Sequence, residues 1–127
     1  MNTKDKLYYF AHPYTNRWPS GERCLQAEEA NFRLCCIRSA QLIALDYKIY
    51  APICHYHSIQ CSLPEFIINK HFNFWYDLDF FMIDRCKFDG IILAPGWEES
   101  VGCVGEYQKF KELGLEILSY VNLVEAV

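Results

Sequence analysis

The segment from Ser100 to Glu106 holds the residues whose types and spacing are best suited to chemistry. Ser100 is a favourable helix N-cap, and Gly102 leaves the backbone amides of the first helical turn uncovered. The positive end of a helix would then face an anion such as a phosphate or a carboxylate. Glu106 lies four residues after Gly102 and returns to nearly the same helix face one turn later. The segment predicts an anion site and a carboxylate in one crevice, although Glu106 could also be an ordinary exposed helix residue.

A second carboxyl group is expected from the aromatic stretch that ends near residue 86. If this stretch is helical, Asp79 shares a face with the apolar Trp75 and Met82, whereas Asp77 falls on a polar face with Asp84. A carboxyl group in apolar surroundings has a raised pKa and can act as a general acid. We therefore favour Asp79 as the second catalytic residue. The alternative is that Asp79 only caps or solvates an irregular helix.

Two histidines follow predicted strands. His12 and His55 are expected to face each other across the crevice, or else to be satisfied by loop backbone. Cys54, His55, His57 and Cys61 can also be interpreted as a metal cluster, but their spacing matches no usual zinc pattern. Histidine-rich loops beside a crevice more often hydrogen-bond a ligand, and we therefore expect no metal.

A nucleotide cofactor is not expected either. Gly102 and Gly105 do not form a dinucleotide fingerprint, because the turn after the first predicted strand is His12-Pro13-Tyr14 and is not rich in glycine. The chain also lacks a Walker lysine motif. The predicted site therefore works without a cofactor.

The composition is typical of one globular domain. With 127 residues, of which 52% are hydrophobic, the chain can bury a core without disulfides or metals. The net charge of −4 argues against a nucleic-acid partner, and no apolar run approaches the roughly 20 residues of a membrane span. The aromatic content of 17% suits either a pocket for a flat ring or an aromatic core. Seven cysteines and an amino terminus unlike a signal peptide favour reduced thiols in the cytoplasm.

Strand and helix patterns alternate along the chain. We predict strands over residues 7–11, 47–51, 88–94 and 115–119 and helices over 23–45 and 101–113. Residues 64–86 are expected to form one helix or two short ones. Loops are predicted over 14–22 and 52–64, and a short tail after residue 119. This alternation predicts one α/β domain with a parallel sheet, helices on both faces and right-handed crossovers. The candidate functional loops then lie at the carboxyl ends of strands, where open α/β sheets bind ligands.

Short motifs spread over the chain match one family in order and spacing. They are residues 8–15, 50–53, 74–75, 89–90 and 96–97, together with Arg33, Ala40, Leu42, His55, Asp79, Ser100, Gly102, Glu106 and Gly114. On these residues the chain resembles the nucleoside 2-deoxyribosyltransferase-like superfamily, and most closely its branch with the domain called DUF1937. The resemblance implies that residues 1–127 form a single domain of this type. It also implies a flavodoxin-like or Rossmann-like parallel sheet of four to five strands.

The resemblance implies roles for particular residues as well. Glu106 would attack the anomeric carbon of a sugar, Tyr9 would orient Glu106, and Asp79 would assist departure of the base. Ser100 and Gly102 would bind a phosphate. The residues expected to contact the substrate are His12, Pro13, His55, Trp97, Ser100 and Gly102. Relatives complete their sites with residues from a neighbouring subunit, so a homo-oligomer, a dimer or larger, is expected.

The function that we expect is cleavage of the N-glycosidic bond of a nucleoside or a nucleoside 5'-monophosphate. The sugar would pass either to water or, as a deoxyribosyl group, to another base. The alternative is a non-catalytic module that binds or senses a nucleotide in the same crevice. A metal-dependent hydrolase built on Cys54, His55 and His57 is the weakest interpretation. The expected partner is a small-molecule nucleoside or nucleotide, with neither nucleic acid nor membrane.

Overall fold

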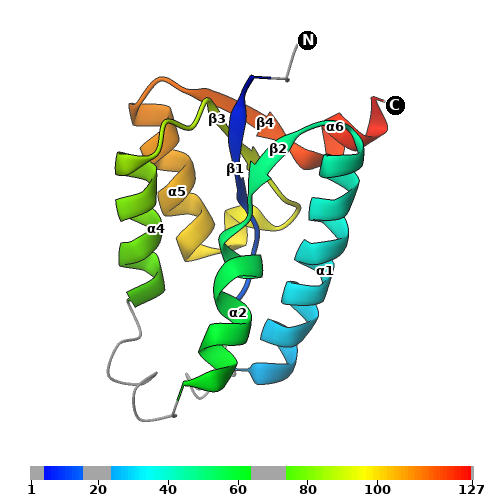
Figure 1. Cartoon of the computed structure of the whole chain (residues 1–127), viewed down its shortest axis with the longest axis vertical. Coiled ribbons are helices and arrows are strands. Elements are labelled where there is room, and N and C mark those ends of the chain that lie inside the picture. Colours follow the sequence, from blue (N-terminus) through cyan, green and yellow to red (C-terminus); the bar gives the residue numbers. More distant parts are fainter. Residues whose placement is uncertain (1–4, 16–23, 64–73, 127) are drawn as a thin grey trace.

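Four short parallel strands form the centre of the molecule. The computed structural model describes residues 5–15, 24–63 and 74–126. The strands are β1 (Leu7–Ala11), β2 (Lys48–Tyr50), β3 (Gly90–Leu93) and β4 (Glu116–Ser119), and they lie in the order β2-β1-β3-β4 (Figure 1). All three pairs of neighbouring strands are parallel. The predicted α/β domain with a parallel sheet is confirmed, and the described residues contribute four strands, which agrees with the expected four to five.

Helices follow every strand. They are α1 (Leu25–Ala44) after β1, α2 (Pro52–Ser62) and α4 (Phe74–Arg85) after β2, α5 (Val101–Glu112) after β3, and α6 (Tyr120–Glu125) after β4. A short 3-10 helix, η1 (Trp97–Glu99), leads into α5. Helices α1 and α6 cover one face of the sheet and α4 and α5 the other, as predicted (Figure 1). None of the described helices is both long and apolar enough to cross a membrane.

The side chains of β1 alternate between two hydrophobic cores. Tyr8 and Phe10 pack in the core that includes residues of α1, α2 and α6. Tyr9 and Ala11 pack in the core that includes residues of α4 and α5. All four residues are buried, because successive residues of a strand point to opposite faces and helices cover both faces here. Tyr9 therefore points towards the helix that carries Glu106.

Residues 52–62, which we predict as most of a long loop, form helix α2 instead. Pro52 occupies the first turn, where the helix does not need the N–H that proline lacks. Ile53, Tyr56 and Gln60 are buried at helical spacing. Tertiary packing thus stabilises a helix whose residues have only modest intrinsic helix propensity.

One further prediction is wrong, and two others fall partly outside the described residues. The predicted carboxyl-terminal tail is helix α6, which follows β4 without a connecting residue. Within the predicted helix over residues 64–86, the structure describes α4. Residues 64–73 of this helix, and residues 16–22 of the predicted loop over 14–22, lie outside the described residues.

Gly90 is expected to tolerate no side chain. A Cβ atom at this position would lie 2.5 Å from the backbone oxygen of Glu116 on β4. Gly90→Ala should therefore lower the free energy of unfolding by about 3 kcal/mol, because β3 and β4 would have to separate locally. A urea titration measures this loss.

The matched control for this substitution is Gly102→Ala. A Cβ atom at Gly102 would meet nothing within 4 Å, so the free energy of unfolding should change by less than about 1 kcal/mol. A Gly90→Ala protein as stable as the Gly102→Ala protein would show that the β3–β4 contact is looser than the structure indicates.

Candidate functional site

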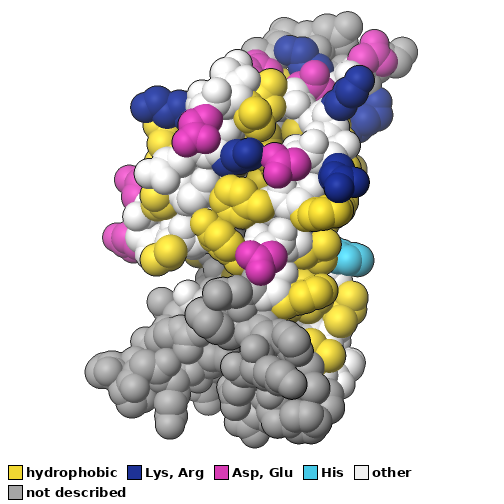
Figure 2. Space-filling model, turned by 90° about the vertical axis from the view of Figure 1, so that its left-hand side faces the viewer, with side chains coloured by type: hydrophobic (Ala, Val, Ile, Leu, Met, Phe, Trp, Pro, Cys, Tyr) yellow, Lys and Arg dark blue, Asp and Glu magenta, His cyan; other side chains and the backbone are white. Residues whose placement is uncertain are grey.

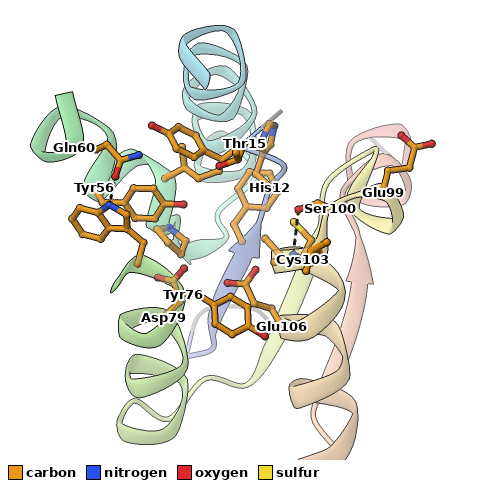
Figure 3. Close-up of a pocket in the computed structure, with 18 residues that line it drawn as sticks. His12, Thr15, Tyr56, Gln60, Tyr76, Asp79, Glu99, Ser100, Cys103 and Glu106 are labelled. Carbon is orange, nitrogen blue, oxygen red and sulfur yellow. Dashed lines mark hydrogen bonds between the residues drawn. The ribbon is translucent and has the colours of Figure 1, made fainter. Parts of the chain in front are cut away.

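A cavity of about 490 Å³ lies at the carboxyl ends of the strands. Its walls come from the end of β1, from α2, from α4 and from the first turns of α5 (Figure 3). The lining includes His12, Tyr14, Tyr56, Gln60, Trp75, Tyr76, Asp79, Ser100, Gly102, Cys103 and Glu106. Small-molecule sites in proteins have similar volumes, about 300–1,000 Å³.

Tyr9 holds Glu106 at the inner wall of this cavity. The Glu106 side chain is buried, and the Tyr9 hydroxyl donates a hydrogen bond to Glu106 Oε2. Tyr9 is itself fully buried, and its ring packs against the rings of Phe88 and Phe110. These contacts fix the position of the hydroxyl, so Glu106 has a defined orientation. The structure thus brings together two of the three residues for which a catalytic role is expected.

Asp79 is the second carboxyl group of the cavity. It lies on α4 and is buried, and its Oδ1 atom has no hydrogen-bond partner among the described residues. Figure 3 shows the carboxyl groups of Asp79 and Glu106 directed into the same part of the cavity. Burial raises the pKa of both groups, and the charge of Asp79 raises the pKa of Glu106 further.

Two buried carboxyl groups that interact in this way share a proton near neutral pH. Burial and the charge of Asp79 raise the pKa of Glu106, and the hydrogen bond that the Tyr9 hydroxyl donates to Glu106 offsets part of this rise. The pair can therefore offer a carboxylate and a carboxylic acid at the same time. Cleavage of a glycosidic bond by a retaining mechanism needs these two groups.

The first turn of α5 adds a site for an anion. Ser100 is the N-cap, as predicted, and its Oγ accepts a hydrogen bond from the Cys103 amide at 3.3 Å. Gly102 lines the cavity and has open space beside its Cα atom, so a ligand can approach the backbone at the helix N-terminus. Glu99 also borders the cavity, but its carboxylate points away from it (Figure 3).

Helices α2 and α4 give the cavity an aromatic wall. The sequence analysis does not predict this wall. The rings of Tyr56 and Trp75 are stacked, with centroids 4.6 Å apart and an angle of 20° between their planes. The indole N–H of Trp75 donates to Gln60 Oε1. Because an indole N–H can only donate, the carbonyl oxygen of Gln60 faces Trp75 and its amide nitrogen remains available to a ligand (Figure 3). The wall thus combines a flat apolar surface with N–H donors.

His12 lines the cavity with both ring nitrogens occupied. Its Nδ1–H donates to the Pro13 carbonyl at 2.8 Å, and its Nε2 accepts from Arg38 Nη1 at 3.0 Å. Burial lowers the pKa of His12, which keeps the ring neutral. In this arrangement His12 shapes the cavity and does not transfer a proton.

Three other residues that we expect at the site do not line the cavity. His55 is exposed on α2, so the expected pairing with His12 across the crevice is not formed. Pro13 follows β1 and lies beside Gly96, which belongs to the loop between β3 and α5. Trp97 packs against Tyr107, with ring centroids 4.7 Å apart. Pro13 and Trp97 therefore support the loops around the site.

Two side chains of the candidate metal cluster on α2, Cys54 and His57, contact residues outside the cluster, and Cys61 Sγ lies 3.7 Å from His57 Nε2 within it. Cys54 Sγ lies 3.6 Å from Cys36 Sγ of α1. The two ring nitrogens of His57 lie 2.7 Å from the Tyr14 hydroxyl and 2.7 Å from Glu29 Oε2. Within the ranges that the structure describes, no three or more His, Cys, Asp or Glu residues are arranged to hold a metal ion.

A family of related domains matches the chain. The family described as "Domain of unknown function (DUF1937)" matches residues 6–122, which is most of the chain. A search of curated proteins found no match.

Proposed function

We propose that this chain, which belongs to the DUF1937 family, cleaves the N-glycosidic bond of a nucleoside or a nucleoside 5'-monophosphate with Glu106 as the nucleophile. The observation that carries the proposal is the buried Glu106, which accepts a hydrogen bond from Tyr9 and shares the cavity with Asp79. The resemblance to the nucleoside 2-deoxyribosyltransferase-like superfamily supports the same chemistry.

The reaction proceeds in two steps at this carboxyl pair. A Glu106 oxygen attacks the anomeric carbon, the bond from that carbon to the base nitrogen breaks, and Asp79 gives its proton to the departing base. The sugar is then attached to Glu106 as an ester. In the second step water or another base attacks the same carbon, its proton returns to Asp79, and Glu106 leaves as a carboxylate.

The walls of the cavity offer a place for each part of a nucleotide. A base can stack on the wall of Tyr56 and Trp75, beside the Gln60 amide. A 5'-phosphate suits the N-terminus of α5 at Gly102. The sugar then lies between these two regions, next to Glu106.

Gln60→Ala is expected to weaken substrate binding more than it slows the chemical step. Loss of the amide hydrogen bond to the base should raise KM about tenfold and leave kcat within about threefold of wild type. Steady-state kinetics of base release measure both constants. Ser58→Ala, at an exposed position of the same helix, is the control and should leave both unchanged. An unaltered KM in Gln60→Ala would remove Gln60 from the proposed base site.

The proposed activity is tested by a chromatographic screen for free base. The panel contains ribo- and deoxyribonucleosides and their 5'-monophosphates, each with and without a second base as acceptor. Release without an acceptor identifies a hydrolase, and release only with an acceptor identifies a transferase. Binding of a panel member in a thermal-shift assay without any release would favour the alternative, a nucleotide-binding module without catalysis.

We also propose that the chain acts as a homo-oligomer, a dimer or larger. Large apolar side chains are exposed on α4, namely Phe74, Tyr76 and Phe81, and apolar side chains are visible among the charged ones on this side of the molecule (Figure 2). A second copy could bury them. Sedimentation of a strict monomer at micromolar concentration would contradict this proposal.

A cytoplasmic location is part of the same proposal. All seven cysteines are free, including Cys36 and Cys54, whose sulphur atoms are in contact. Thiols so close together stay reduced in a reducing compartment. Fractionation of the cells that produce the protein tests this location.

A further inference from the structure

Three cysteine side chains meet where α1 packs against α2. Cys54 Sγ lies 3.6 Å from Cys36 Sγ and 3.8 Å from Cys35 Sγ. The hydroxyl of Ser39 is 3.9 Å from the same sulphur atom. The two helices lie side by side (Figure 1), and neither Cys35 nor Cys36 lines the candidate functional site. This thiol cluster, Cys35, Cys36 and Cys54, is therefore separate from the carboxyl pair.

We infer that Cys36 and Cys54 form an oxidation site, at which a two-electron oxidant such as hydrogen peroxide joins them in a disulfide bond. Their sulphur atoms come from different helices and are already in van der Waals contact, so only a small movement is needed. Both residues are half-buried, whereas Cys35 is fully buried and shielded from an oxidant. Accessibility therefore selects Cys36 as the partner of Cys54.

The surroundings of the cluster also give Cys54 and Cys36 different roles in this oxidation. Hydrogen bonding with Cys35, and to a lesser extent with Cys36 and Ser39, lowers the pKa of Cys54 to about 6. Burial raises the pKa of Cys36 to about 11. Cys54 is thus the thiolate that meets the oxidant first, and Cys36 remains a thiol that reacts second. Cys103 in the candidate site differs, because burial raises its pKa to about 12.

The oxidation balances in two steps. The Cys54 thiolate attacks one peroxide oxygen, the O–O bond breaks, and the hydroxide that leaves takes a proton from solvent to form water. Cys54 is then a sulfenic acid. The Cys36 sulphur attacks the Cys54 sulphur, the S–O bond breaks, and the hydroxyl group leaves as water with the Cys36 proton. Two thiols and one hydrogen peroxide thus give one disulfide and two waters.

This bond would fasten α2 to α1 next to the substrate cavity. Ile53 and Tyr56, the neighbours of Cys54 in α2, line that cavity together with Gln60. A covalent link at Cys54 therefore restrains the helix that carries the aromatic wall. The oxidation site does not depend on the proposed activity, and its test needs no measurement of turnover.

The test uses the reduced, purified full-length chain. The chain is treated with hydrogen peroxide, its remaining thiols are alkylated, and its peptides are mapped by mass spectrometry without reduction. We expect two alkylatable thiols to be lost per chain, a peptide cross-linked through Cys54, and reversal by a reducing agent. All seven thiols remaining, or oxidation that begins at the exposed Cys61, would overturn the inference.

Single substitutions identify the partner of Cys54. Cys36→Ser should abolish the cross-link and let the Cys54 sulfenic acid accumulate, which a 1,3-diketone reagent captures. Cys35→Ala should keep the cross-link, and Cys61→Ser, on the same helix as Cys54, is the matched control that should also keep it. A cross-link that survives Cys36→Ser would assign the bond to another cysteine and refute the proposed pair. Fragmentation of the wild-type cross-linked peptide gives the same assignment if a variant fails to fold.

Discussion

Replacement of Glu106 by glutamine is expected to reduce the rate of base release by about 10⁴-fold, because an amide cannot attack the anomeric carbon. The same substitution should make the protein more stable at neutral pH. Burial and the charge of Asp79 both raise the pKa of Glu106, which shows that the folded protein disfavours a second charge in this cavity. Removing that charge should raise the free energy of unfolding by about 2 kcal/mol.

The matched control is Glu112→Gln, an exposed position in the last turn of the same helix. It should change neither the rate of base release nor the stability. The combination expected for Glu106→Gln, lost activity with gained stability, is typical of a residue kept for function at the expense of folding. A Glu106→Gln protein that releases base at the wild-type rate would eliminate Glu106 as the nucleophile.

Asp79→Asn is expected to reduce kcat by about 10²- to 10³-fold, because the departing base no longer receives a proton. Substrates whose base leaves easily without protonation should lose less. The wild-type rate should fall in acid, where Glu106 also becomes protonated, and in alkali, where Asp79 loses its proton. In Asp79→Asn the alkaline decline should disappear from the pH profile of the remaining activity.

The stability of the Asp79→Asn protein should depend less on pH than the stability of the wild type. Because burial raises the pKa of Asp79, the folded state holds this proton more tightly than the unfolded state. Its stabilising effect is therefore complete below the unfolded pKa of about 4, and it is lost as pH rises through the folded pKa. Urea titrations at pH 5 and pH 8 should differ less in Asp79→Asn than in wild type. The exposed Asp77→Asn is the control, and an unchanged pH dependence in Asp79→Asn would contradict the raised pKa of Asp79.

The sequence predicts the elements whose signals are local. The first turn of α5 is an example. The Ser100 hydroxyl can cap a helix, and Gly102 lacks a side chain that would cover the backbone, and both properties depend on the residue type alone. Tyr8 to Ala11 form a continuous apolar run, which is typical of a strand buried on both faces. The resemblance to the DUF1937 branch is confirmed, whereas the placement in the wider superfamily stays part of the proposal.

Helix α2 shows why part of the site escapes prediction. Pro52 and the two histidines after it favour a loop, although Ile53, Tyr56, His57 and Gln60 are buried at helical spacing. This spacing is the signal that could identify the helix. The loop interpretation selects His55, which is exposed, and overlooks Tyr56 and Gln60, which line the cavity. The stack of Tyr56 on Trp75 joins two helices, and no local pattern encodes such a contact.

Detection of a sugar bound to Glu106 is the most direct test of the central claim, that Glu106 is a nucleophile. The purified chain is mixed with a nucleoside that it cleaves, the reaction is stopped in acid within the first turnover, and the protein is examined by mass spectrometry. We predict a protein heavier by one sugar residue, with the added mass on the peptide that contains Glu106 and with no such species in Glu106→Gln. Release of a full equivalent of base without a sugar on the protein, or with the sugar on another residue, would contradict the mechanism.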